Sequence, residues 1–140
     1  MTGFGLQFHH LGLAVRRPDE AVSFLSGLGY AIGERIFDPE QNVHLILCRH
    51  AQMPAVEVIC PGDAPGPIDN YVARYSSGIV YHACFETTDL AASLAAVKAA
   101  GLRALCISRP RPAVLFGGRA VSFYNIDGMG LIEILEPSLK

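Results

Sequence analysis

Apolar and polar positions follow the same order twice along this chain. In the first half, the pattern predicts a strand over 8–15, a helix over 21–29, and strands over 30–37, 43–48 and 55–60. In the second half, it predicts a strand over 80–87, a helix over 90–101, and strands over 102–108, 119–126 and 131–137. Each half therefore has the order strand, helix, strand, strand, strand, which predicts an α+β fold.

The two predicted helices end at equivalent glycines. Gly29 lies 19 residues after His10, and Gly101 lies 19 residues after His82. Glycine commonly ends a helix because it adopts the left-handed conformation without steric cost. We expect one domain over 1–140, built from two modules at about 6–62 and about 78–138 with a turn-rich linker at about 63–77.

Composition limits the class of protein. Hydrophobic residues make up 51% of the chain and charged residues 17%, which suits a packed globular core. The net charge is −2 and like charges form no runs, so nucleic acid is not an expected partner. The sequence shows neither an apolar stretch of membrane-spanning length nor a signal peptide, so we expect a cytoplasmic protein with no membrane partner.

The four cysteines are scattered along the chain and form no CxxC pair. This spacing predicts neither a disulfide framework nor a zinc ribbon. We expect all four to be small, buried, apolar residues: Cys48, Cys60, Cys84 and Cys106.

A histidine occupies the same place in the first strand of each half. Strand alternation puts His10 and His9 on opposite faces, so one of them points into the core. His82 is the equivalent of His10 in the second half. A single buried histidine is most often a hydrogen-bonded core residue, but the repetition favours a shared role for His10 and His82.

A glutamate stands between apolar neighbours in the last strand of each half. Glu57 lies in "AVEVICP" and Glu133 lies in "LIEILEP". Two imidazoles and two carboxylates form a coherent ligand set for a divalent transition metal. We therefore predict one metal site formed by His10, Glu57, His82 and Glu133, against the alternative of two core histidines and two surface glutamates.

The repeated pattern resembles the vicinal oxygen chelate superfamily, which includes glyoxalase I, bleomycin resistance proteins and extradiol dioxygenases. The residues that carry the resemblance extend from about 8 to 137: "HHLGLAV", "DPEQNV", "VEVICPGD", "YVARYSSGIVYHACFETTDL", "FGGRAVSF" and "LIEILEP". Within the superfamily, the chain is most similar to the methylmalonyl-CoA epimerases. The resemblance implies two paired βαβββ modules that form a glyoxalase-like incomplete barrel with a metal-floored cup.

The resemblance also implies a reaction and its partners. The metal ligands would be His10, Glu57, His82 and Glu133. The metal would be one divalent ion: Co, Zn, Ni, Mn or Fe. Glu133 would move a proton on a small-molecule substrate, possibly an acyl-CoA thioester, through an enolate. The resemblance and the apolar composition together predict a homodimer.

One position departs from the epimerase pattern. The epimerases have a second carboxylate on the strand after the "DPEQNV" turn, and alignment of this turn puts Leu45 there. His44 could serve as the second catalytic residue if a bulge shifted the strand by one residue. Tyr124 and Glu86 are the other candidates for this proton transfer.

Two further residues are predicted to bind the substrate. Arg119 follows "FGG" and could meet an anionic group at the mouth of the cup, because its planar fork suits carboxylate and phosphate. Tyr124, on the penultimate strand, is the second predicted substrate-binding residue. The alternative for Arg119 is a solvated charge on an edge strand.

Other functions share the ligand set or the fold. A glyoxalase I-type lactoylglutathione lyase uses the same four ligands, but the first strand here lacks the arginine that such enzymes place near the histidine. An extradiol dioxygenase would use three protein ligands to iron, and the fourth ligand argues against it. A non-catalytic cup that binds an antibiotic or another ligand remains the alternative without an enzyme activity.

Overall fold

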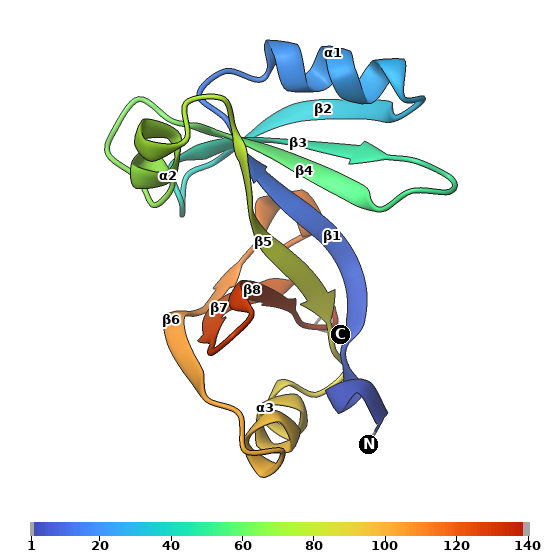
Figure 1. Cartoon of the computed structure of the whole chain (residues 1–140), viewed down its shortest axis with the longest axis vertical. Helices are drawn as coiled ribbons and strands as arrows, with labels where there is room; N and C mark the ends of the chain where they lie inside the picture. The colour runs from blue at the N-terminus through green and yellow to red at the C-terminus, as the bar shows by residue number, and fades with distance from the viewer. Residues whose placement is uncertain (1, 139–140) are drawn as a thin grey trace. The chain divides into compact units, whose positions relative to one another are not determined.

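The computed structural model describes residues 2–138, which form eight strands, three α-helices and two 3₁₀ turns (Figure 1). The strands are β1 (Gln7–Ala14), β2 (Ala31–Asp38), β3 (Val43–Arg49), β4 (Ala55–Pro61), β5 (Ile79–Glu86), β6 (Ala104–Pro112), β7 (Ala120–Ile126) and β8 (Gly130–Leu135). The helices are α1 (Asp19–Gly27), α2 (Asp69–Arg74) and α3 (Leu90–Ala99), and the 3₁₀ turns are η1 (Thr2–Gly5) and η2 (Val114–Phe116). The order strand, helix, three strands occurs twice, as the hydrophobic pattern predicts.

The chain forms two compact units. The first unit is His10–Tyr81, and the second contains residues 2–9 together with residues 82–138. The chain passes from one unit to the other within β1 and again within β5. Each unit therefore contains one set of strand, helix and three strands. The exceptions are residues 7–9 of β1, which lie in the second unit, and residues 79–81 of β5, which lie in the first.

In the first unit, four strands have the order β2-β3-β4-β1. The strand β1 is parallel to β4, and the other neighbours are antiparallel. One face of this sheet packs against α1 through alternate residues of β3 and β4 and through Leu13 of β1, with Leu25 of the helix in the cluster. The opposite face carries the side chains of His10 and Glu57, so the helix leaves the candidate ligands on the other side of the sheet.

The second unit repeats this arrangement with the order β5-β8-β7-β6. The strand β5 is parallel to β8, and the remaining pairs are antiparallel. Ile132 and Ile134 of β8 pack with Val97 of α3 on one face. Glu133 lies between them in the sequence and faces the other side, because side chains alternate along a strand. In both units, we call the face with the candidate ligands the histidine face.

The strand β6 extends beyond its predicted end. We expected a loop from residue 109, but β6 continues through "SRPRP" to Pro112. Two irregularities interrupt its register with β7, between Cys106 and Ser108 and between Ser108 and Arg111. An edge strand with bulges tolerates proline, since its outer N–H groups have no strand to bond to.

The cysteine prediction holds at three of the four positions. Cys48, Cys60 and Cys84 are buried, whereas Cys106 on the edge strand β6 is exposed. Burial raises the pKa of the Cys48 and Cys60 thiols above the ordinary value, so these two stay protonated near neutral pH. Within residues 2–138, no helix has the length and apolar character that crossing a membrane requires.

Candidate metal and substrate site

The first unit holds one buried histidine–glutamate pair. The pairing of β1 with β4 sets Gly12 beside Glu57, and His10 precedes Gly12 by two residues on the same face. His10 is completely buried and Glu57 is almost so. His10 Nε2 lies 3.7 Å from Glu57 Oε1. The glycine between them adds no side chain, so the imidazole and the carboxylate can approach each other.

The second unit holds the equivalent pair. The pairing of β5 with β8 sets Cys84 beside Glu133, and His82 precedes Cys84 by two residues. His82 Nε2 lies 3.3 Å from Glu133 Oε1, and both side chains are buried. The ring of Phe123 meets the His82 ring edge-on, with centroids 5.3 Å apart. The Phe123 contact restricts the orientation of the imidazole.

The geometry of each pair fits two ligands of one metal ion. Ligand nitrogen and oxygen atoms about 2.1 Å from a metal lie about 3.4 Å apart in tetrahedral and about 3.0 Å apart in octahedral coordination. The observed separations of 3.7 and 3.3 Å are close to these values and longer than a typical hydrogen bond. Each of the four residues offers one ligand atom from a buried position. The chemistry and spacing of both pairs therefore suit a divalent transition metal.

The pairing of β3 with β4 determines which side chains of β3 lie on the same face as Glu57. The register of β3 with β4 is regular and pairs Leu47 with Glu57, Leu45 with Ile59 and His44 with Cys60. Leu45 thus lies on the histidine face, and His44 lies on the opposite face. The register of β3 with β4 is continuous from Val43 to Cys48, and the irregularity in the pairing of β2 with β3 lies in β2, so the described strands do not show the one-residue shift that His44 would need. The structure does not support His44 as the second proton-transfer group.

Tyr124 packs on the helix side of its sheet. It is buried with Val97 of α3 and with Ile132, so its side chain lies on the opposite face from Glu133. Burial raises the pKa of the Tyr124 hydroxyl, which therefore stays protonated at neutral pH. The predicted role of Tyr124 at the substrate does not fit this position, and its packing indicates a role in the core.

Arg119 forms specific contacts in the second unit. Its Nε donates to the backbone oxygen of Glu136 at 2.8 Å, and its Nη2 donates to Glu86 Oε2 at 3.2 Å. Glu86 lies two residues after Cys84 on β5 and so shares the histidine face. Arg119 is therefore held at the border of the face that carries Glu133.

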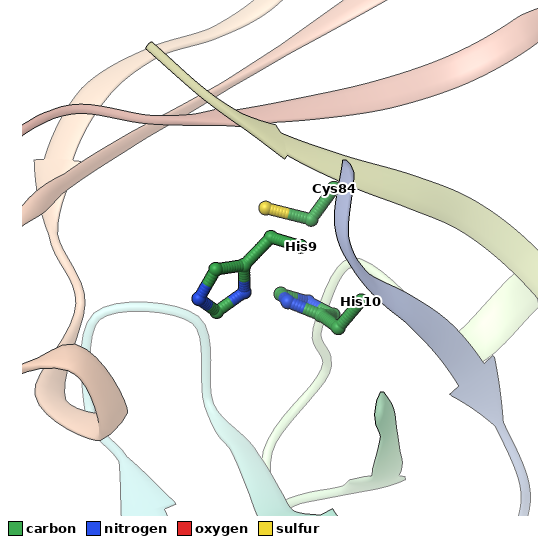
Figure 2. Close-up of side chains that lie close together, drawn as sticks. All are labelled: His9, His10 and Cys84. Carbon is green, nitrogen blue, oxygen red and sulfur yellow. The ribbon is translucent and has the colours of Figure 1, made fainter. Parts of the chain in front are cut away.

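Sequence reasoning missed the position of His9 beside Cys84. A ring nitrogen of His9 and the Cys84 sulfur lie within 4.8 Å of each other, and Figure 2 shows both side chains with that of His10, the next residue along β1. The His9 ring also meets Phe116 edge-on, at 5.2 Å between centroids. Alternation along one strand predicts the side on which His9 lies, but not the residues of other strands that it meets there.

Comparison with known proteins supports the resemblance. The profile described as Glyoxalase/Bleomycin resistance protein/Dioxygenase superfamily matches residues 9–123. An ethylmalonyl-CoA/methylmalonyl-CoA epimerase from Cereibacter sphaeroides is 26% identical over 108 residues, which cover 75% of this chain and 78% of that protein.

Two solved structures share the fold. The methylmalonyl-CoA epimerase of Mycobacterium tuberculosis aligns with a TM-score of 0.75 and 20% identity, over 96% of this chain and 89% of its own. A variant of the Streptomyces coelicolor methylmalonyl-CoA epimerase, in complex with 2-nitronate-propionyl-CoA, aligns with a TM-score of 0.71 and 21% identity, over 95% and 98% of the two chains. Since the superfamily profile covers most of the chain and the fold agrees with it, the chain belongs to the glyoxalase/bleomycin resistance protein/dioxygenase superfamily.

Proposed function

We propose that this protein is a metal-dependent epimerase that acts on an acyl-CoA thioester such as methylmalonyl-CoA. The observation that carries the proposal is the buried histidine–glutamate pair that occurs once in each repeat. Burial of ionisable side chains destabilises a fold unless they are compensated, so two such pairs indicate a function. The substrate class follows the epimerase from Cereibacter sphaeroides, which the chain resembles over 108 residues.

In this proposal, His10, Glu57, His82 and Glu133 together hold one divalent ion. Support comes from the equivalent positions of the pairs in the two repeats and from the separations within each pair. When bound, such an ion supplies positive charge that stabilises negative charge developing on the thioester oxygen.

Glu133 is proposed to exchange the proton at carbon 2 of the substrate. A carboxylate that acts as a general base contributes on the order of 10²–10⁴-fold to a rate. Glu133 is held in place because Cys84 lies beside it on β5 and Phe123 lies beside it on β7. Arg119 is proposed to contact an anionic group of the substrate.

The test is proton exchange at carbon 2 of methylmalonyl-CoA in deuterated buffer. We expect the cobalt-loaded protein to exchange this proton rapidly, and we expect the His82→Ala and Glu133→Gln variants to lose the exchange. Arg103→Gln serves as a control, because Arg103 lies outside the candidate site in the α3–β6 loop. Exchange that does not depend on metal or on these residues would contradict the proposed mechanism.

A glyoxalase I-type reaction is the second candidate, because it requires the same kind of ligand set. If methylmalonyl-CoA shows no exchange, isomerisation of the methylglyoxal–glutathione hemithioacetal becomes the reaction to assay. We also propose a cytoplasmic homodimer, and analytical ultracentrifugation at several protein concentrations tests the dimer.

A further inference from the structure

A cleft of about 710 Å³ in the second unit contains both Arg119 and Glu86. Its other walls come from the N-terminal segment, including Gln7, and from Thr88 after β5. The Arg119 side chain is 24% exposed and the Glu86 side chain is 37% exposed. The Arg119 side chain therefore lines the cleft and is partly exposed, while most of its surface is buried.

Two contacts determine the orientation of Arg119. A guanidinium has five N–H donors, and one of them, on Nε, bonds the backbone oxygen of Glu136. A second donor, on Nη2, bonds Glu86, and this contact is also the ion pair. The bond to the backbone does not depend on Glu86, so Arg119 keeps one anchor if the carboxylate moves away.

The position of Glu86 relates the cleft to the proposed base. Cys84 lies beside Glu133 in the register of β5 with β8, and Glu86 is the next residue of β5 on the same face. Two residues of a strand span about 6.6 Å. Glu86 therefore lies about 6.6 Å further along β5 than Cys84, the residue that pairs with Glu133, and its side chain is on the same histidine face.

We propose that an oxyanion of the substrate binds Arg119 in place of Glu86. This inference rests on the proposed function and deepens it, because the oxyanion would be a phosphate or a carboxylate of an acyl-CoA. Both groups match the planar fork of arginine. Glu86 repels an incoming oxyanion, so the two negative groups compete for one guanidinium. Glu86 thereby keeps Arg119 oriented before binding and weakens the retention of product.

The competition predicts opposite effects of two substitutions. Glu86→Gln keeps an oxygen acceptor for Arg119 but removes the competing charge, so the dissociation constant of the oxyanion should fall by about two- to fivefold. Arg119→Gln removes the fork, so the constant should rise by roughly tenfold or more. In the double variant, Glu86→Gln should bring a smaller gain than in the single variant, because the part of its effect that acts through Arg119 is lost.

Calorimetric titration of the full chain with two probes measures these constants. Coenzyme A carries phosphates without the acyl carboxylate, and methylmalonyl-pantetheine carries the carboxylate without the nucleotide phosphates. The probe whose affinity responds to both substitutions identifies the oxyanion. Arg103→Gln is the matched control for loss of an arginine, and circular dichroism verifies that every variant is folded.

Each outcome bears on the inference or on the proposed function. An unchanged or weaker affinity of Glu86→Gln for both probes overturns the competition, and so does an unchanged affinity of Arg119→Gln. Binding that depends on Arg119 without any proton exchange would support this inference while removing the epimerase proposal. If the unmodified protein binds neither probe, this inference is overturned, whereas the proposed function is decided separately by proton exchange on intact methylmalonyl-CoA.

Discussion

His44 and Leu45 are neighbours on β3, yet their side chains lie on opposite faces of the sheet. The continuous pairing of β3 with β4 sets Leu45 on the side of Glu57 and His44 on the side that packs against α1. The His44 ring contacts Phe37 of β2, with centroids 5.1 Å apart. A polar residue next to the expected catalytic position is therefore separated from it by the thickness of the sheet.

This placement predicts that His44→Gln has little effect on catalysis. Since His44 does not reach the histidine face, we expect the proton-exchange rate to stay close to that of the unmodified protein. Loss of a general base lowers a rate on the order of 10²–10⁴-fold, which is the effect expected for Glu133→Gln. The measurement is exchange at carbon 2 of methylmalonyl-CoA with matched metal loading. A hundredfold loss in His44→Gln would mean that the side chain reaches the substrate.

For individual residues, the sequence predicts which residues form the histidine–glutamate pairs but not every contact in the candidate site. Equivalent places in a repeat identify His10 and His82, because alternation and spacing along the chain determine them. The partners of Arg119 depend on a contact with Glu86, 33 residues away in the sequence. Such a contact leaves no periodic signal, so sequence reasoning could name Arg119 but not its ion pair.

The strand β2 contains a bulge that depends on a glycine. The register of β2 with β3 shifts between Ile32 and Arg35, and Gly33 lies within this interval. A Cβ atom at Gly33 would collide with the backbone oxygen of Leu47. The absence of a side chain therefore permits the close approach of β2 and β3.

Two glycine substitutions should change stability in opposite directions. Gly33→Ala should lower the free energy of unfolding by about 1–3 kcal/mol, because the backbone of β3 must shift. Gly27→Ala should raise it by about 0.5–1 kcal/mol, because Gly27 is helical and has no atom within 4 Å of the added Cβ. Urea unfolding followed by circular dichroism measures both values. Equal changes in the two variants would show that the bulge does not constrain Gly33.

Elements with a clear hydrophobic period are the ones that the sequence predicts well. All eight strands and both long helices occur where alternation or helical spacing indicates them. The predicted end of β6 at residue 108 is wrong. The prolines of "SRPRP" indicate a loop, whereas an edge strand tolerates them and β6 continues to Pro112. The turn η1 has no such period and was not expected, although Phe4 and Leu6 at its end pack against the core that includes Val97.

For the whole molecule, the central hypothesis is that both repeats contribute to one metal site. Each unit alone contains two of the proposed ligands, His10 with Glu57 or His82 with Glu133. Two protein ligands bind a transition metal weakly, whereas four form a complete structural set or leave positions open for a substrate. If the ion is shared, removal of one ligand from either repeat should impair binding to a similar extent.

Metal-dependent stability tests whether the site is shared. After treatment with a chelator, addition of Co²⁺ at 100 times its dissociation constant should raise the free energy of unfolding by about 2.7 kcal/mol. We expect His10→Ala and His82→Ala each to lose this gain at the same Co²⁺ concentration. Differential scanning calorimetry with and without Co²⁺ measures the change in melting temperature. A full gain in either variant would show that one repeat binds the ion without the other.

The route of the chain through its two units has a consequence for synthesis on the ribosome. Residues 2–9 belong to the same unit as residues 82–138, and Leu6 packs into the core of that unit only once Val97 has been made. At about 5–20 residues per second, roughly 5–20 s pass between the translation of these two residues. During this interval, the intervening stretch His10–Tyr81 can emerge and fold first. Residues 2–9 are therefore translated before His10–Tyr81 but reach their final place after it, once the rest of their own unit has been made.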